Sequence, residues 1–119
     1  MIDHGEKIEF SIRRALSLLE RLSELKEDQW DISAYKNALL ARMEIQYIMA
    51  VIRLKTNNSL RTTARSKINA HAAVQLLKSL LAAPISEKTL DSLSQVDLFL
   101  GRFILSMRRR LDRNQKYRI

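Results

Sequence analysis

The stretch from residue 31 to residue 55, DISAYKNALLARMEIQYIMAVIRLK, decides the fold class of this chain. It begins as an amphipathic helix with Tyr35, Leu39 and Met43 on one face, and from Ile45 to Leu54 it is apolar on nearly every side. The polar residues in that part form only a narrow strip: Arg42, Gln46 and Arg53. A helix that is apolar all round is buried on several sides. The stretch therefore predicts a helix that is buried on several sides. Together with the extra apolar residues of residues 86–112, it favours a homodimer.

Three more helices are predicted around this stretch. Residues 3–25 carry apolar residues at alternating spacings of four and three, which is typical of one helix face: Ile8, Ile12, Ala15, Leu19 and Leu22. Polar breaks at residues 26–33, 56–59 and 82–86 contain candidate helix caps and the only proline. The helices are expected over residues 3–25, 31–55, 59–82 and 86–112.

Composition supports an all-α domain. The chain has 119 residues, which suffice for one domain, with only 2 Gly and 1 Pro, too few for a turn-rich β fold. The absence of Cys excludes disulfides and thiolate metal sites. We expect an up-down-up-down four-helix bundle over residues 1–112 and a basic tail over 113–119. The main alternative is a three-helix domain with a docked fourth helix.

Positive charge is concentrated in the second half of the chain. The formal net charge is +8, and all of the excess lies within residues 61–119. Clustered Arg side chains neutralise phosphates and release counterions. The sequence therefore predicts a non-enzymatic protein that binds nucleic acid, DNA or RNA, through its phosphates. The candidate residues are Arg61, Arg65, Arg108, Arg109, Arg110, Arg113, Lys116 and Arg118.

A second hypothesis is a protein-interaction module, such as an adaptor, a chaperone or an assembly subunit. In residues 86–112 a broad apolar face is expected to pack in the bundle, and three apolar residues lie off that face: Leu98, Phe99 and Leu105. Because a helix with one buried side needs only one apolar stripe, these three indicate a partner or burial on a second side.

A third hypothesis comes from the spacing of Arg65 and His71. This Arg and His pair resembles the motif of the HEPN ribonuclease superfamily, whose members are all-α and often dimeric. The resemblance implies a composite RNA-cleaving site built from two protomers. It covers seven residues only, and a structural or surface His is the simpler interpretation of His71.

No other catalytic, metal or cofactor site is predicted. His4 and His71 are the only histidines, and no metal-binding spacing is present. Glu44 and Asp97 are expected to form structural ion pairs with an Arg, the candidates being Arg42, Arg53 and Arg102. The N-terminus lacks targeting features, and the longest apolar run is far shorter than a membrane span. A cytoplasmic protein is therefore expected.

Overall fold

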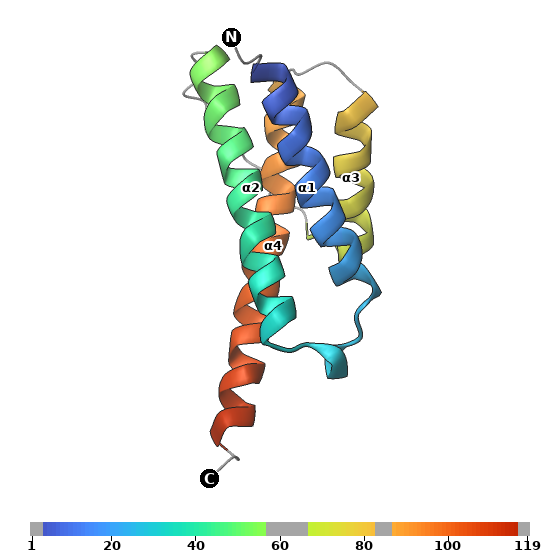
Figure 1. Cartoon of the computed structure of the whole chain (residues 1–119), viewed down its shortest axis with the longest axis vertical. Helices are drawn as coiled ribbons and strands as arrows, with labels where there is room; N and C mark the ends of the chain where they lie inside the picture. The colour runs from blue at the N-terminus through green and yellow to red at the C-terminus, as the bar shows by residue number, and fades with distance from the viewer. Residues whose placement is uncertain (1–3, 57–66, 83–86, 117–119) are drawn as a thin grey trace.

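The computed structural model describes residues 4–56, 67–82 and 87–116, and these residues contain helices and no strand (Figure 1). The α-helices are α1 (His4–Glu24), α2 (Ile32–Thr56), α3 (Ala70–Ala82) and α4 (Glu87–Lys116), with a short 3-10 turn, η1 (Glu27–Gln29), between α1 and α2. The predicted all-α four-helix bundle is confirmed.

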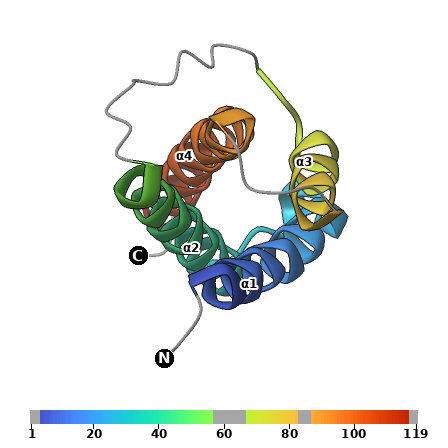
Figure 2. The same cartoon turned by 90° about the horizontal axis from the view of Figure 1, so that it is seen from above.

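The four helices stand at the corners of a square (Figure 2). α1 and α4 each pack against both α2 and α3, whereas α1 does not contact α4 and α2 does not contact α3. The diagonal pairs are therefore α1 with α4 and α2 with α3. Each helix covers the core with one face and leaves the opposite face to solvent.

The direction of α3 departs from strict up-down-up-down order. α2 runs antiparallel to α4, because Arg42 meets Asp97 while Tyr35, earlier in α2, lies opposite Arg108, later in α4. α3 is also antiparallel to α4, since only a short connection separates these two neighbours. α2 and α3 thus run the same way, which is feasible because the positions between Thr56 and Ala70 can span the length of α3.

The core is made of aliphatic side chains from all four helices. α1 supplies the predicted set, from Ile8 to Leu22, and the buried residues of α4 extend from Leu90 to Met107. On α2 the inward face is formed by Ala34, Ala38, Ala41, Ile45, Ile48 and Ile52. Of the three residues that the sequence placed on one face of the first half of α2, Tyr35 is half-buried against the core, whereas Leu39 and Met43 are exposed. Small alanines form the inward face instead.

The third helix is shorter than predicted within the described part of the chain. It begins at Ala70, and residues 67–69 are not helical; the expected start at Ser59 lies outside the described residues. Asn69 caps α3, because its Oδ1 accepts a hydrogen bond of 2.8 Å from the Ala72 amide. An Asn that satisfies an amide of the first turn is a strong start signal, and this one lies ten residues after the expected start.

The last helix is longer than predicted. α4 continues through Arg113 to Lys116 rather than ending near Asp112. Its C-terminal turns extend beyond the N-terminal end of α3, at the bottom of the view in Figure 1. Arg113 is therefore a helical residue, whereas Arg118 lies outside the described residues.

Candidate interaction face

The outer side of α2 is an apolar stripe that faces solvent along the whole helix. Met43 is 64% exposed and Leu54 is 83% exposed. These two residues share the stripe with the large side chains of Ile32, Leu39, Leu40 and Tyr47, all of which are exposed. A stripe directly opposite the core cannot pack within the bundle. The prediction that the part from Ile45 to Leu54 is buried on several sides is wrong for its outer side, where Tyr47 and Leu54 are exposed.

Two charged residues beside the stripe form ion pairs within the chain. On the side toward α4, Arg42 Nε donates to Asp97 Oδ1 at 3.1 Å. On the side toward α1, Glu44 Oε1 lies 3.5 Å from Arg14 Nε. Structural ion pairs were predicted for both acids; Arg42 was among the candidates, and Arg14 was not. Arg42 and Glu44 are thus paired within the chain, whereas Lys36 on the stripe and Arg53 beside it are exposed.

Two residues of α4 continue the apolar surface beside α2. Leu98 follows Asp97, whose carboxylate marks the contact with α2, and Leu105 lies one turn after Gly101, which contacts the Arg42 guanidinium. Leu98 and Leu105 are exposed. Phe99, predicted with them, is instead half-buried and packs on Phe103 at a ring-centroid distance of 5.7 Å. We call the α2 stripe with Leu98 and Leu105 the interaction face.

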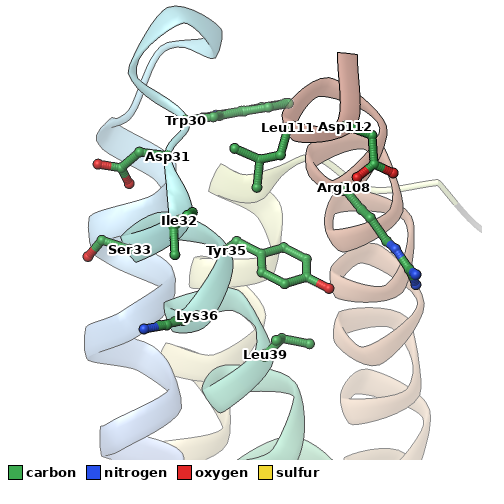
Figure 3. Close-up of a pocket in the computed structure, with 10 residues that line it drawn as sticks. All are labelled: Trp30, Asp31, Ile32, Ser33, Tyr35, Lys36, Leu39, Arg108, Leu111 and Asp112. Carbon is green, nitrogen blue, oxygen red and sulfur yellow. The ribbon is translucent and has the colours of Figure 1, made fainter. Parts of the chain in front are cut away.

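A cleft of about 910 Å³ lies between the start of α2 and the end of α4. Figure 3 shows Tyr35 and Leu39 directed from α2 toward α4, with Leu111 and Arg108 on the other wall. Ile32 also lines the cleft, so the cleft is continuous with the interaction face. More of its wall area is apolar than polar, and four of its lining residues are charged: Asp31, Lys36, Arg108 and Asp112.

Trp30 closes the end of this cleft. Its ring packs edge-to-face on Phe103 with centroids 4.8 Å apart, and the Arg110 guanidinium lies 5.9 Å from its ring centroid. Its Nε1 is enclosed and has no hydrogen-bond partner among the described residues. The side chain of Trp30 is half-buried against the end of the bundle.

The consecutive arginines of α4 point in different directions because successive helical residues are about 100° apart. Arg108 lines the cleft, whereas Arg110 lies over Trp30 on another side of the helix. Arg109 and Arg113 are exposed and share a face by their spacing of four. Arg102, one of the three arginines expected as candidates for an ion pair, is exposed on this face as well, seven residues before Arg109.

The structure places none of the remaining candidate site residues on the interaction face or in the cleft. Arg61, Arg65 and the side chain of Lys116 lie outside the described part, so their expected juxtaposition with Arg108 stays a prediction. His71 is exposed in the first turn of α3, which agrees with the interpretation of it as a surface His. No cluster of metal-ligating residues occurs among the residues that the structure describes.

Comparison with known proteins gives no family assignment: no family model, curated protein or solved structure matches the chain. Within residues 4–56, 67–82 and 87–116, no helix has both the length and the apolar character needed to cross a bilayer.

Proposed function

We propose that this protein is a helical assembly module that works by docking its interaction face on a protein partner. The observation that carries this proposal is the apolar stripe along the outer side of α2, opposite the core. Single exposed apolar residues are normal on protein surfaces, but a continuous set over an entire helix marks an interaction site. The cleft supplies a recess at one end of the same face.

The area of the face supports this proposal. Its eight exposed apolar side chains offer on the order of 800 Å², which is comparable to what each partner buries in a typical stable complex. The largest apolar patch on an ordinary monomer measures roughly 300–600 Å². Exposure of a larger patch carries an aggregation risk, so a partner that covers it is the simpler explanation.

Site-specific photo-crosslinking in cells tests this function. A photoreactive residue at Met43 should give a crosslinked species of defined mass, whereas the same residue at Gln75 on the exposed side of α3 should not. Both positions are exposed, so neither insertion disturbs the core. The proposal fails if Met43 yields no discrete species, or if Gln75 yields the same species with equal efficiency.

A second function, binding of nucleic acid through its phosphates, is supported by the outer row of α4. Arg102, Arg109 and Arg113 are exposed on one helix face, and no ion pair is found for them among the described residues. Arg binds phosphate with two parallel hydrogen bonds. Contacts of this kind give affinity without sequence preference, so binding of both DNA and RNA is expected.

Fluorescence anisotropy with a labelled oligonucleotide tests this second function. Replacing Arg109 and Arg113 with Gln should weaken binding at least tenfold at low salt, and should reduce the salt slope by about 2 because two phosphate contacts are lost. The control carries the same charge change on α1, at the exposed Lys7 and Arg21. Equal losses in both variants, or no binding by the parent protein at low salt, would exclude this function.

A further inference from the structure

We propose that the partner docked on the interaction face is an acidic amphipathic helix, with apolar residues along one side and Asp or Glu beside them. This inference rests on the proposed assembly function and names the chemistry of the partner. Three features carry it: the cations set among the apolar residues, the elongated shape of the face, and the recess at one end.

The outer side of α4 alternates apolar and cationic residues. Leu98, Arg102, Leu105 and Arg109 follow one another at spacings of four, three and four, and all are exposed. Residues at these spacings share one face of a helix. A surface that covers Leu98 and Leu105 therefore also meets Arg102 and Arg109.

α2 adds two more cations to this surface. Lys36 lies on the apolar stripe and Arg53 lies beside it, and both are exposed. Among the described residues no ion pair is found for these two or for Arg102 and Arg109. A charge that is buried without a partner is strongly destabilising. A cover that places carboxylates opposite these cations avoids that cost, so the chemistry of the surface selects an acidic partner.

The acids on the same surface do not balance these cations. Glu44 and Asp97 are already in ion pairs, and Asp31 Oδ1 accepts a hydrogen bond of 2.9 Å from the Ala34 amide. The exposed acids that remain in the described part of α4 are Asp91 and Asp112. A second copy of this chain would bring the same excess of positive charge, so charge complementarity favours an acidic partner over self-association.

The shape of the face favours a helix as its occupant. α2 and α4 lie side by side (Figure 2), and the exposed apolar residues form a strip along them rather than a compact patch. From Ile32 to Leu54 this strip is about 33 Å long. A helix laid along it contributes apolar residues at i, i+3, i+4 and i+7, and its flanking positions reach the cations on either side.

The cleft gives the partner helix an anchor point. It has a volume of about 910 Å³, and Figure 3 shows Tyr35, Leu39 and Leu111 beside it. A large apolar side chain inserted there would be enclosed by both helices. A lipid surface cannot fill such a recess, and the carboxylates of Asp31 and Asp112 that line it would repel anionic headgroups. The recess therefore favours a protein helix over a membrane.

Fluorescence anisotropy with two synthetic peptides tests the chemistry of the partner. Both are about 22 residues long to match the strip, carry a label and a Leu stripe at helical spacing, and contain no Trp. One has Glu beside the stripe and the other has Lys. The Glu peptide should bind the full chain at least tenfold more tightly at low salt, and added salt should weaken its binding because exposed charges are screened. Equal affinity of the two peptides, or binding by neither, would overturn the inference.

Charge reversal assigns this binding to the interaction face. Arg102→Glu combined with Arg109→Glu should weaken binding of the Glu peptide at least tenfold. The matched control is Lys67→Glu with Lys78→Glu, at exposed positions before and on α3, which lies diagonally opposite α2. It should keep the parent affinity. Circular dichroism should show unchanged helix content in both variants, since all four positions are exposed. Equal losses in the two variants would indicate attraction by net charge alone and would overturn the inference.

Mass spectrometry of the Met43 photo-crosslink separates this inference from the proposed function. The crosslinked segment should belong to another protein, with apolar residues at helical spacing and more Asp and Glu than Lys and Arg. If the segment is neutral or basic, or comes from a second copy of this chain, the acidic helix is excluded while the assembly function stands. If Met43 crosslinks only to lipid or nucleic acid, or yields no discrete species, both proposals fail.

Discussion

Gly101 shows how one residue affects the contact between α2 and α4. A Cβ added at this position would lie 3.2 Å from Arg42 Nη2 and 3.3 Å from Arg42 Cζ. The atoms nearest to this mid-helix glycine are therefore those of a guanidinium and not of a backbone. The neighbour is the far end of a flexible side chain, which can move by a few tenths of an ångström.

Gly101→Ala should therefore stabilise the fold. Alanine gains about 1 kcal/mol in helix propensity, whereas the half-exposed Arg42–Asp97 pair is worth about 0–1 kcal/mol and would be weakened rather than lost. Urea denaturation followed by circular dichroism measures the free energy of unfolding. Gly101→Leu is the informative contrast, because its larger side chain must displace Arg42 and should lower stability. A loss of stability in Gly101→Ala would show that the contact is rigid.

At the scale of a helix, α2 shows that apolar periodicity predicts a helix but does not by itself tell which apolar face packs in the core. The sequence contained two apolar series, and the larger side chains of Leu39 and Met43 suggested the packed one. The structure packs the alanine series, which runs from Ala34 to Ile52 at spacings of four and three. Because the alanine positions continue into the buried isoleucine positions with the same spacing, the sequence alone could have identified the inner face. Small residues there let α1 and α4 approach α2 closely.

The stability of α3 depends strongly on the cap of its first turn, because α3 is the shortest of the four α-helices. Asn69→Ala removes the side-chain acceptor of the Ala72 amide and should cost about 1 kcal/mol of stability. Asn69→Asp keeps an acceptor and adds a favourable negative charge at a helix N-terminus, so it should retain full stability. Both are measured by thermal unfolding. Equal loss in the two variants would argue against capping by this side chain.

For the whole molecule, a docked partner links stability to concentration. If the interaction face binds the Glu peptide, the native state gains stability from binding, and the Tm should rise with peptide concentration. Trp30 fluorescence reports the unfolding of the whole bundle, because the four helices share one core. The variant with Arg102→Glu and Arg109→Glu provides the control, and its Tm should be independent of peptide concentration. A Tm of the parent protein that does not respond to the peptide would contradict the docking, and a rise with the concentration of the chain alone would indicate the homodimer that the sequence favours.

The sequence alone determined the helical class, since periodic apolar positions and scarce Gly and Pro act locally. It also determined the helices that became α1 and α2 to within one residue, and it revealed apolar surplus on α2. Only the tertiary structure decided which face of α2 is covered, that α3 runs parallel to α2, and that Arg108, Arg109 and Arg110 diverge. The first two features depend on how the helices pack across the core, because packing brings together side chains that are far apart in the chain. The third depends on the rotation of the helix, which points successive residues in different directions.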